Sequence, residues 1–496
     1  MNKNKVPFIL IDETSDVPIY RQIYESIRQS ILNGKLQPKT QLPATRLLAK
    51  QLSVARMTII NAYEQLFAEG YLEGKGGSGT FVAARLPEEF LNVEQPQKKQ
   101  TETAERVIKF SNFGKHLVKN RGMLLPRYSS GESLPFRHGI PAIDHFPFDI
   151  WAKIAQKQIK VGATNTFSYG SAKGFEPLCQ AIAAHLSITR GVNCTAEQII
   201  ITNGIQQALD LIGNIFLSKN DEVCLEDPTY FGTNDIFSAI GAKIIPVPID
   251  KEGFEVEKAK KQSQKPRLIY VTPSHQYPLG MTMSLTRRIN LLEWARETEA
   301  FIIEDDYDSE YRYAGRPFAS LQGLDRNGRV LYIGTFSKTV FPALRLGFIV
   351  APTDLVETLT SAKALRDWHS PSIEQAILAE FITDGHFAKH LRKMRGLYEK
   401  RQQILLEAAE KHLKGMLEVE PATSGMHLIG WLPEGVDDKP FFQAGLRQNL
   451  QLHPIFASCI SQNLRGGLFL GYTSFDEIQL KEGVKRLKKV LLANIN

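Results

Sequence analysis

Apolar residues near the start of the chain recur at every fourth position. At this spacing their side chains share one face of a helix. The residues are Ile19, Ile23, Ile27 and Ile31. Pro18 comes directly before the run and Gly34 follows it, which are typical signals for the start and the end of a helix.

Two further helices are predicted after this one. Residues 42–52 form a short apolar and basic run, and Ser53 is expected to cap a longer helix that ends at Gly70. On a helical wheel the apolar arc of this longer helix holds Ile59, Ile60, Tyr63, Leu66 and Phe67. The opposite arc holds Met57, Thr58, Asn61 and Gln65. Residues 71–83 then read as strand, glycine-rich turn and strand.

Farther along the chain the pattern changes to short apolar runs separated by helical stretches. Six runs of strand length occur, at 198–204, 221–228, 242–249, 267–273, 300–306 and 329–336. Amphipathic stretches such as 205–217 and 285–298 lie between several of them. Near-continuous apolar strands that alternate with helices predict an α/β domain with a largely parallel sheet, covered on both faces.

Composition divides the chain into three parts. Residues 84–109 are rich in Gln, Glu, Lys and Thr and poor in aromatic residues, as expected of a solvated linker. We therefore expect a multidomain protein with a small domain over 1–83, a linker over 84–109 and a large domain over 110–496.

Charge and cysteine content narrow the class of protein only slightly. The chain has 496 residues, a net charge of +7 and four cysteines without paired spacing. No apolar run reaches the length of a membrane span, and the first residues do not resemble a signal peptide. These features predict a cytoplasmic protein without a membrane partner or a disulfide framework.

The first domain reads as a winged helix-turn-helix. In such a module the N-terminal residues of the second helix enter the major groove of double-stranded DNA, and here these would be Arg56, Thr58 and Asn61. Arg46 and the turn at Gly77 and Ser78 would contact phosphates. From the pattern alone, a small helical docking domain with a solvated polar face remains an alternative.

A lysine just beyond an apolar strand carries the candidate chemistry of the large domain. Lys338 follows the run at 329–336, and a lysine amine that forms a Schiff base must be reachable and partly desolvated. Thr335 and Ser337 place hydroxyl groups beside it, and Arg345 adds a planar cation suited to a phosphate. This combination predicts an aldehyde cofactor that carries a phosphate, namely pyridoxal 5'-phosphate.

A pyridine cofactor also needs a carboxylate on its ring nitrogen. In an extended chain Asp305 and Tyr307 point the same way, whereas Asp306 faces away. Asp305 could therefore pair with the ring nitrogen while Tyr307 donates to the ring hydroxyl. The strand-to-helix turn at 202–209 could bind the phosphate with its backbone N–H groups, and Tyr230 could cover the ring face.

Residues 42–83 resemble the GntR-type winged helix-turn-helix over nearly their whole length. The resemblance rests on Leu42–Pro43, on Arg46, on the Arg56–x–Thr58 pair, on Ala62–Tyr63, on Glu69–Leu72 and on Gly77–Thr80. Ala55 departs from the Ser or Thr that is frequent there.

From about residue 134 onward the chain resembles the fold-type I aminotransferases, and with the GntR-type start it looks like a member of the MocR subfamily of transcription regulators. The motifs are at 169–186, 202–209, 226–230, 272–280, 304–313, 334–347 and 424–428. The resemblance implies that Lys338 carries the Schiff base, and that the backbone of Ile205 and Gln206 joins Ser337 and Arg345 at the phosphate. It also implies a homodimer, with Tyr169 at the partner subunit's phosphate, and Arg465 as the receptor of an effector carboxylate.

The chain departs from the family pattern in two places. Tyr277–Gly280 replaces the Asn–Pro–Thr–Gly of many aminotransferases, so the contact of that loop with the ring oxygen is in doubt, and Gln276 is a candidate to replace it. A related regulator that senses γ-aminobutyrate has an arginine two residues after the stacking tyrosine, where this chain has Gly232. His386 and His390 have the spacing of a zinc pair, but no third ligand accompanies them, so we expect no metal site.

The leading hypothesis is a pyridoxal-phosphate-dependent transcription regulator that binds operator DNA and senses the cofactor itself or a small amino compound. The alternative is an active aminotransferase with an appended DNA-binding domain. The sequence leaves open whether transamination is retained.

Overall fold

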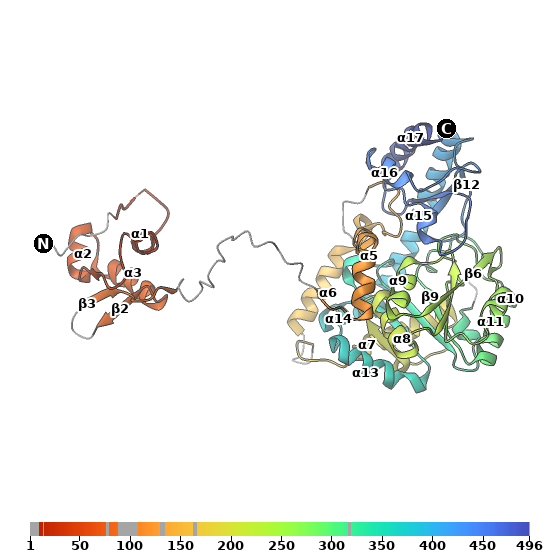
Figure 1. Cartoon of the computed structure of the whole chain (residues 1–496), viewed down its shortest axis with the longest axis horizontal. Coiled ribbons are helices and arrows are strands. Elements are labelled where there is room, and N and C mark those ends of the chain that lie inside the picture. The colour runs from red at the N-terminus through yellow and green to blue at the C-terminus, as the bar shows by residue number, and fades with distance from the viewer. Residues whose placement is uncertain are drawn as a thin grey trace. The chain divides into compact units, whose positions relative to one another are not determined.

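The computed structural model of the chain describes residues 9–12, 14–75, 79–87, 108–128, 134–161, 166–315 and 319–495. The chain divides into two compact units (Figure 1). We call Met1–Ile108 the head and Lys109–Asn496 the body.

Three helices build the core of the head. They are α1 (Ile19–Leu32), α2 (Thr45–Leu52) and α3 (Arg56–Ala68). The predicted face of α1 is confirmed, because Ile23, Ile27 and Ile31 are buried. They pack with Ile59 and Leu66 of α3. The predicted apolar arc of α3 is partly wrong, because Phe67 is 38% exposed whereas Ala62 is fully buried.

Ser53 does not cap α3 as expected. It has a left-handed backbone (φ 53°) and ends α2, with its N–H donating to the Ala49 carbonyl. The N-cap of α3 is Ala55, which makes no side-chain cap. The tight joint between the two helices needs a left-handed residue to end the first one, so Ser53 belongs to α2.

The two strands predicted at the end of the head are confirmed. Strand β2 (Leu72–Lys75) pairs antiparallel with β3 (Gly79–Val82). A short strand that was not predicted, β1 (Gln41–Leu42), pairs with the other edge of β3. Gly77 and Ser78 of the turn lie outside the described residues.

An eight-stranded sheet runs through the body in the order β4-β11-β10-β9-β8-β5-β6-β7. Its strands are β4 (Ile199–Thr202), β5 (Glu222–Asp227), β6 (Lys243–Asp250), β7 (Gly253–Phe254), β8 (Leu268–Val271), β9 (Phe301–Asp306), β10 (Val330–Thr335) and β11 (Gly347–Val350). The pairs from β10 to β6 are parallel, and β4, β11 and β7 add antiparallel pairs at the edges. All six predicted strands are present, and the largely parallel α/β fold is confirmed.

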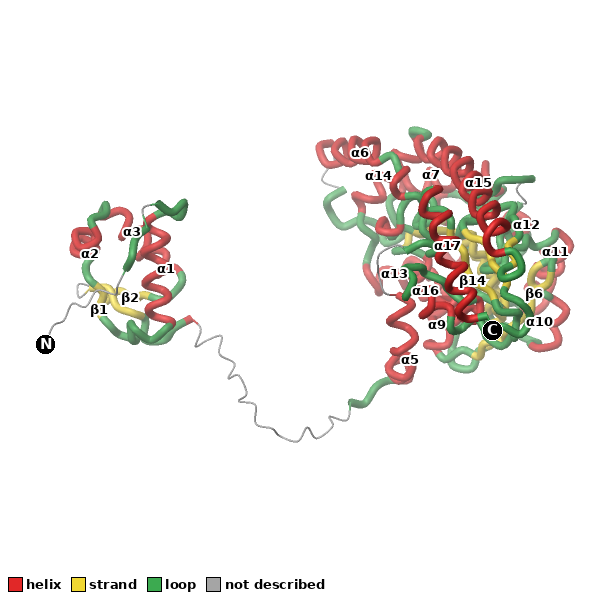
Figure 2. The backbone as a smooth tube through the Cα atoms, turned by 90° about the horizontal axis from the view of Figure 1, so that it is seen from above, coloured by secondary structure: helices red, strands yellow, loops and turns green. Residues whose placement is uncertain are grey.

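Helices cover both faces of this sheet, as Figure 2 shows by the strands enclosed among helices. The helices of this part of the body are α5 (Asn112–Tyr128), α6 (Phe148–Val161), α7 (Glu176–Arg190), α8 (Ile205–Phe216), α9 (Phe231–Ile240), α10 (Val256–Gln262), α11 (Leu285–Thr298), α12 (Leu321–Leu324), α13 (Val356–Asp367) and α14 (Ser372–Thr383). Neighbouring strand residues face opposite cores: Ile303 packs with α8 residues, whereas Ile302 packs with α10 and α11 residues. This alternation explains why the strands are apolar throughout.

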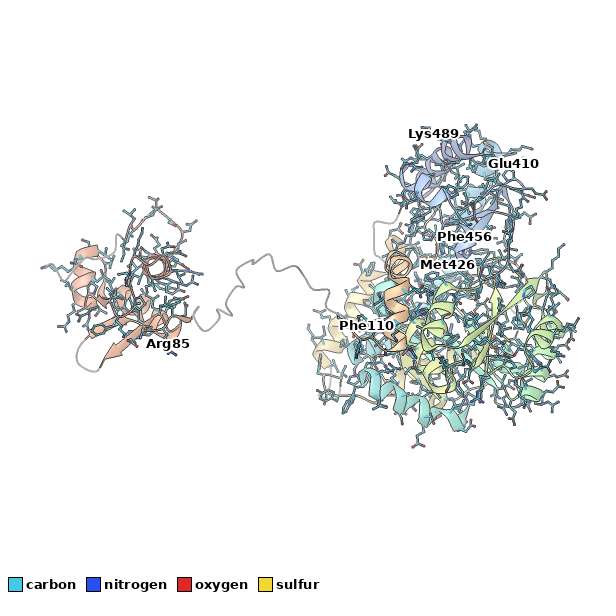
Figure 3. All side chains as sticks on the ribbon, viewed as in Figure 1. Arg85, Phe110, Glu410, Met426, Phe456 and Lys489 are labelled. Atoms are coloured by element: carbon cyan, nitrogen blue, oxygen red, sulfur yellow. The ribbon has the colours of Figure 1, made fainter. Side chains whose placement is uncertain are left out.

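The C-terminal part of the body is a separate layer. Strands β12 (Glu418–Val419), β13 (His427–Trp431) and β14 (Gly467–Gly471) form an antiparallel sheet beside α15 (His386–Leu413), α16 (Phe441–Leu446) and α17 (Glu477–Asn494). Short 3₁₀ turns complete the body at Ile143–His145, Ala196–Gln198, Pro342–Leu344, Thr353–Leu355 and Ile455–Ser458. Figure 3 labels Met426 between this layer, which carries Glu410 and Lys489, and the larger part of the body.

Candidate functional site

A cavity of about 670 Å³ lies where several strands of the body sheet end. Ile205 lies just after β4, Tyr307 just after β9, and Ser337 and Lys338 just after β10. Residues from the C-terminal layer, such as Met426 and His427, close the cavity from the other side. Ligands in open α/β folds bind at the carboxyl ends of the strands, and this cavity occupies that position.

Lys338 places its amine inside the cavity. Its Nζ donates a hydrogen bond to the Gly139 carbonyl at 2.8 Å. Burial holds the pKa of Lys338 below its ordinary value, although Asp308 and Asp305 oppose this shift. A lowered pKa increases the neutral fraction of the amine, which is the nucleophilic form.

Asp305 and Asp306 face opposite sides of β9, as the sequence predicted. Oδ2 of Asp305 accepts a 2.6 Å hydrogen bond from Tyr270, while its buried Oδ1 has no partner among the described residues. Burial raises the pKa of Asp305 to about 7. Asp306 instead accepts from Arg190 at 2.7 Å and from Tyr332 at 2.6 Å. Asp305 is thus the carboxylate presented to a ligand, and Asp306 is structural.

Tyr307 belongs to a buried hydrogen-bonded chain that sequence reasoning missed. Its hydroxyl lies 2.9 Å from Nδ1 of His275, and the same nitrogen lies 3.1 Å from both carboxylate oxygens of Asp308. Gly425 makes room for the imidazole, because a Cβ there would lie 2.2 Å from its ring. The motif at 272–280 contains His275, but only the fold brings it to Tyr307.

The residues that follow β10 and those at the start of α8 are suited to bind a phosphate. The Ser337 hydroxyl is buried without a partner in the described structure, and the Ser337 N–H donates to the Thr335 hydroxyl at 3.1 Å. Arg345 lies over the start of α8, where its Nη2 donates to the Asn203 carbonyl at 3.1 Å. The first N–H groups of α8, at Ile205 and Gln206, have no intrahelical acceptors.

Tyr230 lies beside the same part of the cavity and is held by Gln206. The Gln206 Nε2 donates to the Tyr230 hydroxyl at 2.7 Å. A Cβ at Gly232 would lie 2.3 Å from that Nε2 and 2.6 Å from the Tyr230 ring. The position two residues after Tyr230 therefore has no space for a side chain in this arrangement.

In the head, four of the residues expected to contact DNA lie on α2 and α3. Arg46, Arg56 and Asn61 are exposed and Thr58 is half-buried. Met57 is 61% exposed, which is unusual for a large apolar side chain at the start of a helix. These side chains are free to meet a groove, while Ile59 and Tyr63 hold the other side of α3 in the core.

Comparison with known proteins assigns both units. The model of bacterial regulatory proteins of the gntR family matches residues 19–82, and that of class I and II aminotransferases matches residues 141–465. The chain is 37% identical to the probable rhizopine catabolism regulatory protein MocR of Rhizobium meliloti, across 98% of this chain and 96% of that protein. It is 30% identical to aromatic-amino-acid aminotransferase 1 of Thermococcus litoralis, across 74% of this chain and 90% of that protein.

A solved structure of LysN, an α-aminoadipate aminotransferase from Thermus thermophilus, is 28% identical, with a TM-score of 0.70 over 78% of this chain and 98% of that one. This chain belongs to the MocR family of transcription regulators.

Two expectations for this MocR-family chain are wrong. Arg465 does not line the cavity, because its guanidinium binds the Leu432 carbonyl and pairs with Glu418 at 2.7 Å. Gln276 is buried behind the cavity wall, where its Nε2 donates to the carbonyls of Pro228 and Tyr277. Both expectations rest on the place of the residue in a motif, whereas the direction of each side chain follows from packing that the motif does not encode.

Tyr169 also lies away from the cavity of its own chain. It is 82% exposed, and its ring lies 5.5 Å from that of Trp368. Its expected contact is with a partner subunit, and it stays a prediction.

The far end of the cavity in this MocR-family chain holds residues that sequence reasoning missed. Three histidines, His138, His427 and His453, line it together with Arg137 and Phe442. The ring of His138 lies 5.0 Å from that of His453 and 5.7 Å from that of His427. Burial lowers the pKa of His427 and of His453 to about 4 and holds the pKa of His138 well below its ordinary value, so all three are neutral near pH 7.

His386 and His390, the two histidines with the spacing of a zinc pair, each lie next to a phenylalanine ring. His390 packs edge-on against Phe146, and His386 lies near Phe381. Within the described ranges no three His, Cys, Asp or Glu side chains are placed to share a metal ion.

Among the helices that the structure describes, none has the length and apolar character needed to cross a bilayer.

Proposed function

We propose that this chain regulates transcription by binding operator DNA through its head and by holding pyridoxal 5'-phosphate in its body as the sensor of a small amino compound. The observation that carries the proposal is the cavity around Lys338. There a buried amine meets two polar atoms without protein partners in the described structure, Oδ1 of Asp305 and Oγ of Ser337. Buried polar atoms are normally satisfied, so these two call for a ligand.

The donors and acceptors around the cavity fit this cofactor. Asp305 would pair with the ring nitrogen, Tyr307 would donate to the ring oxygen, and Tyr230 would cover one face of the ring. The phosphate would be bound by Thr335, Ser337, Arg345 and the backbone N–H groups of Ile205 and Gln206. Lys338 would hold the cofactor covalently. When bound, the cofactor supplies an aldehyde carbon that bonds either to the lysine amine or to a ligand amine.

The residues of this chain then decide how the site responds. The lowered pKa of Lys338 favours the neutral amine, and Asp305 in its ionised form favours a protonated ring nitrogen. If a ligand displaces Lys338 from the cofactor, the released lysine amine could donate to the Gly139 carbonyl, as it does in this structure. Such a change regulates DNA binding only if it favours one arrangement of the heads over another.

We further propose that the chain acts as a homodimer in the cytoplasm, the compartment that holds bacterial DNA. Two heads on two linkers would reach two half-sites of an operator. Tyr169, which is exposed in one chain, would contact the phosphate bound by the partner.

The test is a fluorescence-anisotropy titration with the DNA upstream of the chain's own gene. The protein is used alone, with the cofactor, and with the cofactor plus a panel of amino acids. Sequence-selective and salt-dependent binding that the cofactor or one amine alters is the expected result. If the cofactor alone changes the affinity and no amine does, the chain senses the cofactor itself. Selective binding that none of these additions changes would refute the sensing role.

An active aminotransferase is the second candidate, favoured by the side chains suited to a pyridoxal cofactor that line the cavity around Lys338. Amino-group transfer from an amino acid to 2-oxoglutarate at about 1–1000 per second would place the chain among ordinary enzymes. Rates far below that range, together with ligand-dependent DNA binding, would leave regulation as the main role.

A further inference from the structure

The turn that leads from β4 into α8 presents the backbone N–H groups proposed to bind the cofactor phosphate. Gly204 is the N-cap of α8, and its φ of 85° lies in the region that favours glycine. The first N–H groups of a helix bind an anion well only when the turn before them holds them in the right direction. The contacts that fix this turn therefore decide how well a phosphate is bound.

Two residues of the turn are tied to each other and to a single carboxylate. Oε1 of Gln207 accepts a hydrogen bond from the Asn203 N–H at 2.8 Å. Oδ2 of Asp367 accepts from Nδ2 of Asn203 at 2.6 Å and from Nε2 of Gln207 at 2.7 Å. Asn203 and Gln207 flank residues 204–206, so this closed set of hydrogen bonds holds the turn at both ends.

Asp367 is the last residue of α13, and the backbone changes direction directly after it. The next residue, Trp368, has a positive φ of 64°, which is rare for an aromatic residue and costs free energy. Its N–H nevertheless donates to the Ala364 carbonyl at 3.2 Å. Such a conformation persists only where the surrounding contacts maintain it. The end of α13 is therefore held in one arrangement, with the carboxylate facing the turn.

Lys363 supplies the counter-charge that this carboxylate needs near a phosphate. The lysine is fully buried, and its Nζ lies 2.8 Å from Oδ1 and 3.1 Å from Oδ2 of Asp367. The same Nζ donates to Oε1 of Gln207 at 3.3 Å. An unpaired carboxylate behind the turn would repel a bound phosphate, whereas the ion pair has no net charge. The pair can thus orient the turn without opposing the anion.

The ion pair acts on the site from behind the cavity wall. Among the described residues that line the cavity, neither Asp367 nor Lys363 occurs, and both reach the turn through Asn203 and Gln207. Arg345, which does line the cavity, donates to the Asn203 carbonyl at 3.1 Å. Asn203 therefore connects the ion pair with the arginine that is expected to contact the phosphate.

We propose that Asp367 and Lys363 are positioning residues that set how tightly the site binds the phosphate of its cofactor, without touching the cofactor themselves. The inference rests on the proposed function in one respect, namely that the ligand of the turn is the phosphate of pyridoxal 5'-phosphate. Donors that are oriented in advance cost less to order on binding. Loss of the network should therefore weaken the contacts of the phosphate and leave those of the ring unchanged.

The experiment compares pyridoxal 5'-phosphate with pyridoxal, which has the same ring and aldehyde but no phosphate. Each compound is titrated into the full-length protein after removal of bound cofactor, and binding is followed by visible absorbance. The ratio of the two dissociation constants measures the contribution of the phosphate. A calorimetric titration with inorganic phosphate measures the same turn without the aldehyde.

The main variant is the double change Lys363→Met and Asp367→Ala, which removes the network without leaving a buried unpaired charge. We expect the preference for the phosphorylated compound to fall at least about 5-fold, while the affinity for pyridoxal changes by less than about 2-fold. Lys363→Met alone leaves Asp367 without its counter-charge and should reduce the preference further. If the double variant does not fold, Gln207→Leu, which keeps the ion pair but removes one of its links to the turn, should lower the preference in the same direction.

The matched control is the double change Asp210→Ala and Arg366→Met. It removes a 3.7 Å ion pair between the same two helices, α8 and α13, and should leave the preference unchanged. An unchanged preference in the variants of the network would overturn the proposal, as would an equal loss of affinity for both compounds. A comparable loss of preference in the control would also overturn it, because any weakened contact between α8 and α13 would then be sufficient.

Failure of the proposed function has a different signature. If neither compound produces visible absorbance with the original chain, Lys338 does not react with the aldehyde. The titration with inorganic phosphate then decides the role of the ion pair alone. Weaker phosphate binding in the double variant supports that role, whereas equal binding, or no binding by the original chain, overturns it.

Discussion

The two ends of the cavity are lined by different kinds of side chain. At the cofactor end, hydroxyl groups, carboxylates and a lysine follow directly on strands of one sheet. Two polar atoms there, Oδ1 of Asp305 and Oγ of Ser337, have no protein partner among the described residues. At the far end, neutral histidines and apolar side chains come from three separate segments. The first end is suited to one fixed group with several polar atoms. The second is suited to ligands that differ in shape.

The largest effect should come from the lysine of the cofactor end. Lys338→Ala removes the covalent link, so the visible absorbance that remains after dialysis against cofactor-free buffer should disappear. Lys160→Ala, which changes an exposed lysine of α6, should retain it. Retained absorbance in Lys338→Ala would show that the cofactor is bound without this lysine.

The adjacent aspartates of β9 should separate ligand binding from stability. Asp306→Asn leaves the buried Arg190 without its counter-charge and should lower the free energy of unfolding by about 3–5 kcal/mol, measured by urea denaturation. Asp305→Asn should not lower the free energy of unfolding and should raise it at pH 7, because the buried carboxyl of the original chain has a raised pKa and is costly to ionise. It should instead weaken cofactor binding at least about 10-fold. Comparable destabilisation by both changes would contradict the division of roles.

The two ends should respond to pH with opposite signs in the cofactor-free protein. Burial raises the pKa of Asp305 from 3.8 to about 7, so its contribution to stability is present below about pH 4 and is lost as the pH rises through 7. Burial lowers the pKa of His427 from 6.5 to about 4, so its contribution is present above pH 6.5 and is lost as the pH falls through 4.

Variants reveal these two effects as differences from the original chain. Between pH 4 and 7, Asp305→Asn should gain stability relative to it as the pH rises, by up to about 1.4 kcal/mol per pH unit. His427→Gln should gain stability relative to it as the pH falls. Urea denaturation at several pH values measures both, and slopes of the same sign would refute the contrast between the two ends.

A smaller effect is expected from changes to His275 and Asp308, which form the hydrogen-bonded group with Tyr307. His275→Phe keeps a ring of similar size but removes the contact with the Tyr307 hydroxyl. The ring oxygen of the cofactor would then lose a well-oriented donor and hold its proton more tightly. The pH midpoint of the visible absorbance should therefore rise, by about one unit or less. Asp308→Asn should shift it in the same direction, whereas an unchanged midpoint in both variants would show that Tyr307 needs no such support.

The smallest effect on cofactor and ligand binding is expected from a substitution in the head. Arg56→Ala should weaken operator binding and reduce the dependence on salt by about one phosphate contact if the side chain meets the backbone. Cofactor absorbance and ligand affinity should stay unchanged. A change in ligand affinity would show that the head influences the cavity even without DNA.

The cofactor end could be predicted from the sequence because its residues lie at the ends of strands. There the local alternation of residues determines which way each side chain points. The alternation along β9 was enough to distinguish Asp305 from Asp306, and the apolar runs were enough to place the sheet. Both depend on neighbours in the sequence.

The far end was not predictable in the same way. His138 and His453 are more than 300 residues apart, and only the pairing of residues 135 and 136 with the segments at 451 and 471 brings their rings together. The same limit explains two of the errors. Arg465 turns toward Glu418 because of β12, and Ser53 takes a left-handed backbone because of the joint between α2 and α3. Neither cause is visible in a motif.

The glycine at position 232 also has a consequence for how relatives of this chain can diverge. A new arginine there would collide with Gln206 and with the Tyr230 ring that Gln206 holds. A single codon change would therefore damage the cofactor pocket before it offered any new contact. A lineage that acquires an arginine at this position must also move or replace the Gln206 side chain, so we expect positions 206 and 232 to change together.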